Sequence, residues 1–204
     1  MDDITFILNY IDKMENKNKK FKTNYSSLDK LLKAGFNKGT LNEITGDYFT
    51  GKSTLCINIL KNIDENISAL YIVTNNNNNT MLLQEFSNKD NITIIISNKE
   101  SVITSLLNRT INYFDLIIID SIADVLSISE EEHELCMNYK QNLKPLIRQL
   151  YELAYGTDKV IIAVNSLIYL NNILTSKYNE VMKIYCSSRI LMDRNYQIII
   201  IKEQ

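Results

Sequence analysis

The sequence predicts an α/β fold in which a mostly parallel sheet is flanked by helices and closed by an antiparallel C-terminal edge. Three observations lead to this prediction. Apolar runs rich in Ile and Val alternate with helical stretches, which is typical of buried parallel strands joined by crossover helices. A glycine-containing turn directly follows the first run, as at many strand-to-helix junctions. The last part of the chain breaks the alternation with two adjacent strand-like runs, which predicts a hairpin at the sheet edge.

The N-terminal segment precedes this pattern and differs from it. Residues 3–16 carry apolar side chains at helical spacing, and lysines crowd residues 17–22. We therefore expect residues 1–24 to form an N-terminal helix and a basic linker, and residues 25–204 to form one core. Core packing is the expected role of Phe6.

The spacing of the apolar residues predicts the helices and strands of the core. A short helix is expected from Ser26 or Ser27, either of which can cap it, and it should end before Gly35. Strands are expected at residues 41–45, 69–73, 92–96, 116–119 and 160–164, helices at 53–63, 80–86, 101–113 and 131–155, and strand-like runs at 181–192 and 196–201 around a turn at 193–195.

Residues 46–53, Gly-Asp-Tyr-Phe-Thr-Gly-Lys-Ser, fit the phosphate-binding pattern G-x-x-x-x-G-K-[ST]. The two glycines let the backbone curl so that its N–H groups point at phosphate oxygens, and the next helix adds its positive N-terminal end. Lys52 would reach the terminal phosphates, and Ser53 would offer its hydroxyl to magnesium. The sequence thus predicts ATP and magnesium as cofactors, with contacts at Gly46, Asp47, Tyr48, Phe49, Thr50, Gly51, Lys52, Ser53 and Thr54.

A second nucleotide signature lies at residues 114–121, Phe-Asp-Leu-Ile-Ile-Ile-Asp-Ser, an apolar strand that ends in an acid. In a phosphate-loop protein, the carboxylate at this point lies beside the bound metal. Asp120 is therefore predicted to hold magnesium through its water shell, and Ser53 and Asp120 together form the expected metal site.

Residues 27–56 resemble the opening of the RecA/RadA recombinase core, most closely its archaeal and eukaryotic branch. Residues 118–123 are similar to the metal-binding strand of that family, and residues 183–191 resemble its closing strand. The resemblance extends from about residue 25 to the C-terminus. It implies a RecA-like, DNA-linked P-loop ATPase, either a filament-forming recombinase or a paralog such as RadB that assists one.

Two departures from the family concern hydrolysis. The family strand matching residues 69–75 ends in an acid, a small residue and the glutamate that activates water, whereas this chain has Val73 and Asn75 in place of the acids. Asn75 can at most position a water, because an amide cannot take its proton. Ser166 stands where the family has a glutamine that senses the γ-phosphate, and it is too short for that reach. Weak or absent hydrolysis is therefore expected.

A third departure concerns DNA. The two loops that touch DNA in the family correspond to a stretch with four glutamates at residues 130–134 and to residues 167–180, which contain one Lys and no Arg or Gly. The net charge of −2 also disfavours a protein that coats nucleic acid. Direct contact with single-stranded DNA should be weak. The lysines at 17–22 are either a phosphate-contacting arm or a solvated linker.

Single residues exclude some other chemistries. The three cysteines are widely spaced, which supports neither a disulfide framework nor a zinc site, and Cys56 is expected to be buried. His133 is the only histidine, so a histidine cluster around it is excluded. Arg189 either pairs with an acid inside the sheet or approaches a phosphate, and the pairing is the expectation.

Localisation follows from what the sequence lacks. It has no apolar run long enough to span a bilayer, and it begins with acidic residues instead of a basic signal region. We expect no membrane association and an intracellular, soluble protein, nuclear in a eukaryote or cytoplasmic in a prokaryote.

The leading functional hypothesis is an ATP-binding recombinase paralog that supports homologous recombination and DNA repair beside a recombinase or another paralog, in a hetero- or homo-oligomer. The alternative is a RecA-fold ATP-binding regulatory or assembly subunit that does not bind DNA. A third reading is a scaffold that uses nucleotide only for stability. The motifs favour the first hypothesis, and the acidic first loop favours the second.

Overall fold

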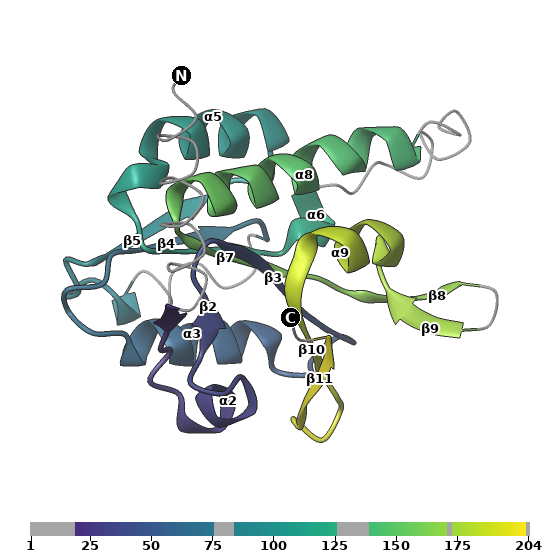
Figure 1. The fold of residues 1–204 in the computed structure, drawn as a ribbon, viewed down its shortest axis with the longest axis horizontal. Helices are drawn as coiled ribbons and strands as arrows, with labels where there is room; N and C mark the ends of the chain where they lie inside the picture. The colour runs from purple at the N-terminus through teal and green to yellow at the C-terminus, as the bar shows by residue number, and fades with distance from the viewer. Residues whose placement is uncertain (1–18, 76–83, 126–138, 171–172, 203–204) are drawn as a thin grey trace, which may run out of the picture.

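The computed structural model describes residues 19–75, 84–125, 139–170 and 173–202. A seven-stranded sheet runs through the middle of the molecule in the order β11-β10-β3-β7-β6-β4-β5 (Figure 1). Neighbouring strands are parallel from β10 to β5, and β11 pairs antiparallel with β10 at the edge. The predicted fold class is confirmed.

The described strands from β3 to β7 and the helices α3 and α5 agree closely with the bounds predicted from periodicity, whereas residues 80–83 and 131–138 of two predicted helices lie outside the described residues. The strands of the main sheet are β3 (Thr40–Gly46), β4 (Ala69–Val73), β5 (Ile92–Ile96), β6 (Leu116–Asp120), β7 (Val160–Val164), β10 (Cys186–Met192) and β11 (Ile198–Lys202). The helices are α2 (Ser26–Leu31), α3 (Lys52–Asn62), α5 (Glu100–Thr110), α6 (Ile122–Val125), α8 (Tyr139–Thr157) and α9 (Asn179–Tyr185), and a 3-10 turn, η2 (Ile111–Tyr113), follows α5.

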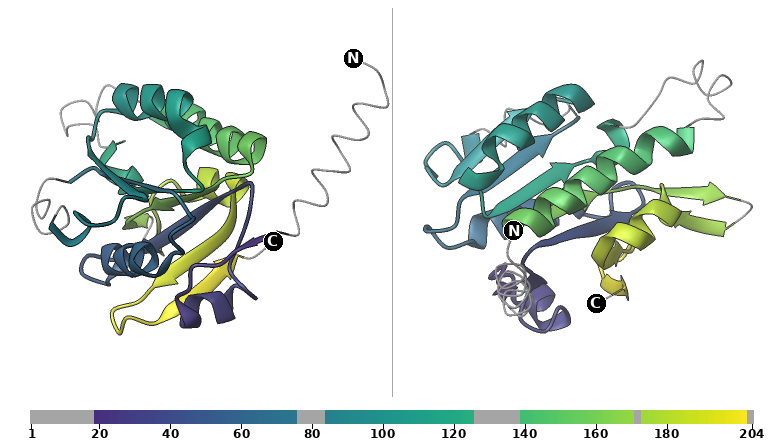
Figure 2. Two further views of the ribbon diagram at one scale, coloured as in Figure 1. Left: turned by 90° about the vertical axis from the view of Figure 1, so that its left-hand side faces the viewer. Right: turned by 45° about the horizontal axis from the view of Figure 1, so that its top comes forward.

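Two hydrophobic cores lie on opposite faces of the sheet. Alternate residues of β6 divide between them: Ile118 belongs to the core under α2 and α3, whereas Ile117 and Ile119 belong to the core under α5 and α8. Helices therefore cover both faces of the sheet (Figure 2). Because the central strands are buried on both sides, their sequences are continuous apolar runs instead of alternating ones.

The C-terminal third differs from the sequence prediction in two places. Residues 181–185, expected to begin a strand, belong to α9 instead, and β10 begins at Cys186. Met182 is buried against the second core while Ile184 is 66% exposed, so the segment follows helical and not strand periodicity. In addition, β8 (Leu167–Leu170) and β9 (Ile173–Ser176) form an antiparallel pair that projects from the body (Figure 1).

The described part of the N-terminal segment packs on the core. A two-residue strand, β1 (Lys20–Phe21), pairs with β2 (Phe36–Asn37), and Phe21 is buried. The Lys20 ammonium donates hydrogen bonds to two backbone carbonyls, those of Leu32 and Gly35, each at 3.2 Å. Phe6, Lys17 and most of the segment 1–24 lie outside the described residues, so the division at residue 24 stays a prediction.

Candidate functional site

The phosphate-loop motif forms the junction between β3 and α3. Gly46 ends the strand, and a Cβ there would lie 2.6 Å from both the Met192 carbonyl oxygen and the Thr50 hydroxyl oxygen. Gly51 has a φ of +84° directly before the first residue of α3. Gly46 is thus required because neighbouring atoms leave no room for a side chain, and Gly51 is required because its backbone is left-handed. The loop between them therefore has the backbone shape that the predicted phosphate cradle needs.

The Lys52 ammonium folds back over this loop. It donates hydrogen bonds to the carbonyl oxygens of Gly46, at 3.0 Å, and Asp47, at 2.6 Å. Burial lowers the pKa of Lys52, while the carboxylates of Asp120 and Asp47 oppose that shift. Its two partners are backbone carbonyls, which are weaker partners for a cation than an anion is. Phosphate oxygens can therefore replace them.

Arg194 reaches the loop from the turn between β10 and β11. Its Nε and Nη2 atoms donate to Asp47 Oδ2 at 3.2 Å and 2.5 Å. This contact and the Tyr48 N–H hold the pKa of Asp47 below its usual value. The sequence pattern names Asp47 but not Arg194, because the pair depends on how the hairpin is placed next to the loop.

Asp120 ends β6 under the first turn of α3. The hydroxyls of Ser53 and Tyr71 hydrogen-bond its carboxylate, and the Tyr71 hydroxyl lies 2.7 Å from Oδ2. Burial raises the pKa of Asp120, while these hydrogen bonds and the Lys52 ammonium oppose the rise. The structure thus brings the predicted metal pair, Ser53 and Asp120, into contact.

The donor set fits magnesium, which prefers carboxylate, hydroxyl and phosphate oxygens. Among the described residues, no group of three or more His, Cys, Asp and Glu side chains gathers as a metal-binding cluster. An ion held by Ser53 and Asp120 would therefore take most of its coordination from the nucleotide and from water.

The aromatic residues of the loop point outward. Tyr48 is 76% exposed, and Phe49 is 95% exposed with a φ of 61°. Beside the loop, a cavity of about 230 Å³ is lined by residues of α3, including Thr54, and of the β10–β11 hairpin, including Tyr196. Its place next to Gly51 and Thr54 makes it continuous with the phosphate loop.

The end of β4 carries a buried polar cluster that the sequence analysis missed. The Thr74 hydroxyl donates to the Ser121 carbonyl at 3.0 Å and lies 3.2 Å from Asp124 Oδ2, which also accepts from the Ser121 hydroxyl at 2.8 Å. Asp124 is close enough to influence the pKa values of Lys52 and Asp120. Its signal in the sequence is a second acid in the turn after the apolar strand. Asn75 follows this cluster as an exposed residue.

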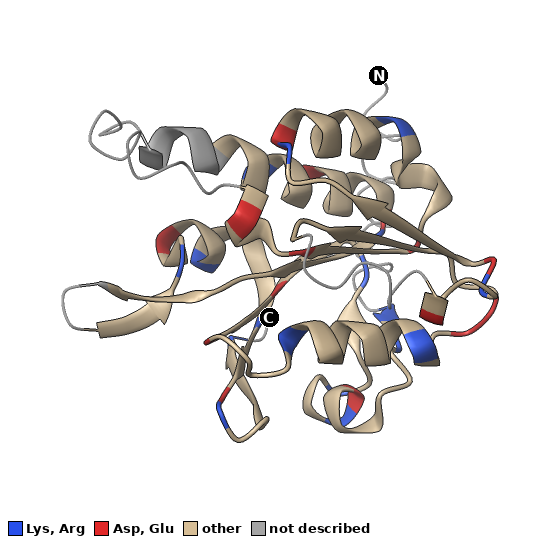
Figure 3. Cartoon of the chain, turned by 180° about the vertical axis from the view of Figure 1, so that it is seen from behind, with Lys and Arg blue, Asp and Glu red and all other residues tan. Residues whose placement is uncertain are grey.

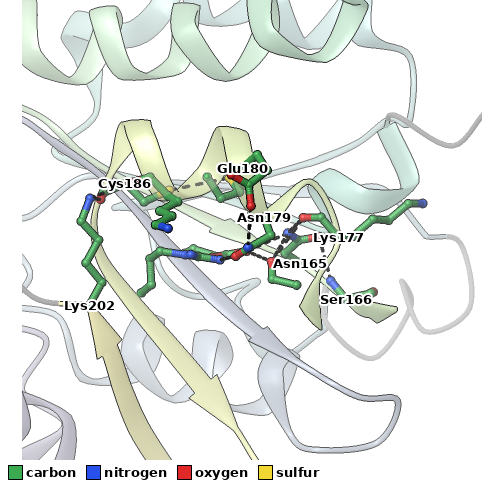
Figure 4. Close-up of polar contacts among 12 residues, drawn as sticks. Asn165, Ser166, Lys177, Asn179, Glu180, Cys186 and Lys202 are labelled. Carbon is green, nitrogen blue, oxygen red and sulfur yellow. Dashed lines mark hydrogen bonds and ion pairs between the residues drawn. The ribbon is translucent and has the colours of Figure 1, made fainter. Parts of the chain in front are cut away.

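The Asn165–Ser166 pair ends β7, as predicted, but Asn165 faces a second polar cluster. Its amide donates to Glu43 Oε1 at 2.7 Å and to the Lys177 carbonyl at 2.6 Å. The Arg189 Nε donates to Glu43 Oε2 at 2.5 Å, so the predicted pairing of Arg189 with an acid inside the sheet is confirmed. Figure 4 shows Asn165, Lys177 and Asn179 converging at the base of α9.

The candidate DNA-contacting loops are described only in part. Residues 130–134, with His133, lie outside the described residues. In the second loop, Tyr169 and Ile173 on the β8–β9 pair are 77% and 67% exposed. Basic and acidic residues are interspersed over the described chain (Figure 3). Within the described residues, the helices include none long and apolar enough to cross a membrane.

Comparisons with known proteins show the fold. No protein-family model matches the chain, and a search of curated proteins found no match. A KaiC-like protein of the hyperthermophilic archaeon Pyrococcus horikoshii OT3 is similar in structure, with a TM-score of 0.67 and 16% sequence identity over 91% of this chain and 89% of that chain. In total, 627 chains of solved structures match, so the RecA-like fold does not by itself select an activity.

Proposed function

We propose that this chain binds ATP with magnesium at the β3–α3 loop and works as a recombinase paralog in homologous recombination and DNA repair. The observation that best supports ATP binding is the geometry of the loop: Gly46 where a side chain cannot fit, Lys52 hydrogen-bonded to two backbone carbonyls that phosphate oxygens can replace, and Ser53 in contact with Asp120.

Each part of the site has a task in this proposal. Lys52 leaves the carbonyls of Gly46 and Asp47 for the terminal phosphates, and the backbone N–H groups of the loop hold the remaining phosphate oxygens. Ser53 and Asp120 hold magnesium, which neutralises phosphate charge when bound. The cavity beside Thr54 and Tyr196 takes the nucleoside, because it adjoins the loop and has both an apolar lining and polar side chains.

Slow turnover is part of the proposal. Asn75 occupies the position of the expected base, and Ser166 stands where the family has the longer glutamine side chain. With a proton acceptor absent from position 75, ATP binding is expected to act mainly as a conformational signal.

A protein partner is the proposed target of that signal. The β8–β9 pair presents Tyr169, Ile173 and other apolar residues where the family's second DNA loop would lie, and Lys177 is the only basic residue between positions 167 and 180. Exposed apolar side chains of this kind suit contact with another protein better than contact with phosphates. The partner proposed is a recombinase or another paralog.

The experiment that tests this function measures binding of single-stranded DNA with and without ATP, for the chain alone and with a recombinase. The expected result is weak, salt-sensitive binding alone and tighter, ATP-dependent binding with the recombinase. The Lys52→Ala variant should lose the ATP dependence. Cooperative, high-affinity coating of DNA by the chain alone would contradict the paralog proposal and indicate an active recombinase.

The second candidate is a RecA-fold ATP-binding regulatory subunit that never contacts DNA. The apolar, weakly charged β8–β9 pair supports it as well. In that case ATP would change the affinity for a protein partner, while the recombinase complex would bind DNA equally well with and without this chain.

A further inference from the structure

Tyr71 is an unusual residue for its position. It interrupts β4, Ala-Leu-Tyr-Ile-Val, in which its neighbours are aliphatic, and it is only 1% exposed. A buried tyrosine hydroxyl loses its contacts with water, so it needs a partner inside the protein. Here that partner is the Asp120 carboxylate, at 2.7 Å.

The register of the sheet makes this contact possible. β4 and β6 are parallel neighbours, and Val73 lies opposite Asp120. Tyr71 lies two residues earlier on the same face as Val73, and both belong to the core that packs under α3. The long tyrosine side chain therefore runs along the sheet and ends under the carboxylate.

The contact fixes a group that would otherwise rotate. A carboxylate at a strand end can turn about its side-chain bonds, and hydrogen bonds from neighbouring groups decide which way its oxygens face. Close packing holds the Tyr71 ring, so its hydroxyl is a fixed donor. Burial and the charge of Asp120 raise the pKa of Tyr71, so the hydroxyl keeps its proton.

We propose that Tyr71 is a positioning residue for the magnesium site: its hydroxyl holds Oδ2 of Asp120 so that the carboxylate faces Ser53 and a metal bound there. This inference rests on the proposed ATP and magnesium binding. It assigns to Tyr71 a role in how tightly magnesium is held, and no contact with the nucleotide.

The test compares wild type and Tyr71→Phe, which keeps the ring in the core and removes only the hydroxyl. Affinity for ATP is measured by calorimetry from excess EDTA to saturating magnesium. The magnesium concentration that gives the half-maximal gain in affinity should rise about 10- to 100-fold in Tyr71→Phe. Affinity for ATP in EDTA should not change, because the phosphate loop is intact.

Two controls separate positioning from general damage to the fold. Tyr151→Phe removes a hydroxyl from α8, whose side chains pack on the opposite face of the sheet, and should leave the magnesium dependence unchanged. In an Asp120→Ala background, Tyr71→Phe should cause no further change, since there is no carboxylate left to hold. A purely structural role would make the two changes additive.

Three outcomes would overturn the inference. If Tyr71→Phe has the magnesium dependence of wild type while Asp120→Asn weakens it, the metal site is real and Tyr71 does not position it. If the two substitutions are additive, Tyr71 acts through the fold. If wild type itself gains no affinity from magnesium, the proposed cofactor is wrong and the role of Tyr71 is wrong with it.

Discussion

The phosphate loop after β3 and the buried cluster around Glu43 within β3 hold their charges in different ways. In the phosphate loop, Lys52 is held by backbone carbonyls, and Arg194, whose side chain is 82% exposed, holds Asp47. In the second cluster, Glu43 and Arg189 are buried and face each other directly. The exposed or carbonyl-bound charges of the loop can exchange their partners for a ligand. The buried charges of Glu43 and Arg189 are removed from water and depend on each other.

This difference predicts that the two clusters have different roles. The Glu43–Arg189 pair joins β3 to β10. Glu43 also accepts a hydrogen bond from Asn165 at the end of β7, and Arg189 donates one to Asn179 at the base of α9. The buried cluster should therefore govern stability. The phosphate loop should govern ligand affinity, with little effect on the unliganded fold.

The largest effect is expected from breaking the buried pair. Glu43→Ala leaves the Arg189 guanidinium buried without a counter-charge and should lower the free energy of unfolding by about 3–5 kcal/mol. Urea unfolding measures this loss. Glu152→Ala on α8 is the matched control, because it breaks an exposed pair with Arg148 and should lower the free energy of unfolding far less. Equal losses in the two variants would remove the distinction between the clusters.

An acid placed at position 75 should change the rate of ATP hydrolysis and not the stability of the fold. Asn75→Glu places a proton acceptor two residues after β4, where solvent reaches it. Because a general base typically contributes about 10²- to 10⁴-fold, ATP hydrolysis should accelerate within that range. Steady-state phosphate release measures the effect, and Asn75→Gln, which has the same reach but no charge, should not accelerate it. Rapid hydrolysis by wild type that is lost on changing Asp124 would instead identify Asp124 as the base.

Removing Lys52 should separate affinity from stability most directly. Saturating ATP at about 100 times its Kd should stabilise wild type by about 2.7 kcal/mol. Lys52→Ala should lose most of this gain, while its melting temperature without ligand stays close to that of wild type, since the lost hydrogen bonds are to the Gly46 and Asp47 carbonyls and Asp120 keeps its bonds from Ser53 and Tyr71. Thermal unfolding with and without ATP and magnesium tests this. A mutant that keeps the full ATP gain would show that the phosphates bind elsewhere.

The sequence predicted the strand, loop and helix at residues 40–62 well because the signals for this shape are local. The glycine positions, Lys52 and Ser53 lie within eight residues, and the strand that ends at Asp120 is continuous and apolar. Long-range pairs were harder to predict: Arg194 meets Asp47 and Arg189 meets Glu43 across more than 140 positions. Which arginine pairs with which acid depends on the order of the strands in the sheet. The spacing of apolar residues along the chain does not reveal that order.

The predicted C-terminal hairpin is confirmed, and the prediction was wrong at residues 181–185 for a related reason. Residues 181–185 contain apolar side chains that fit either a strand or a helix over so short a window. Met182 is buried in the core under α8, and this tertiary contact favours the helix over a strand. Tyr71 was missed because a tyrosine in a buried strand looks like ordinary core packing until its hydroxyl is seen to reach Asp120.

The smallest effect is expected from Arg194→Ala. This variant tests whether the exposed pair at the phosphate loop affects ligand affinity and not stability. The pair with Asp47 is exposed and screened by solvent, so the free energy of unfolding should change little. Asp47 would remain charged beside the phosphates without its counter-charge. ATP affinity should therefore fall by up to about fivefold at low salt, and by less at high salt, because solvent ions screen exposed charges.

Calorimetric titration with ATP and magnesium at two salt concentrations measures this change, and Arg148→Ala, which also removes an arginine from an exposed pair, is the control for net charge. The double variant Asp47→Ala, Arg194→Ala should recover most of the lost affinity, because the unpaired carboxylate is gone. If Arg194→Ala instead reduces ATP affinity far more than tenfold at both salt concentrations, and the double variant does not recover, Arg194 must contact the phosphates itself. The loop cluster would then include a ligand-binding arginine that Asp47 only holds until ATP arrives.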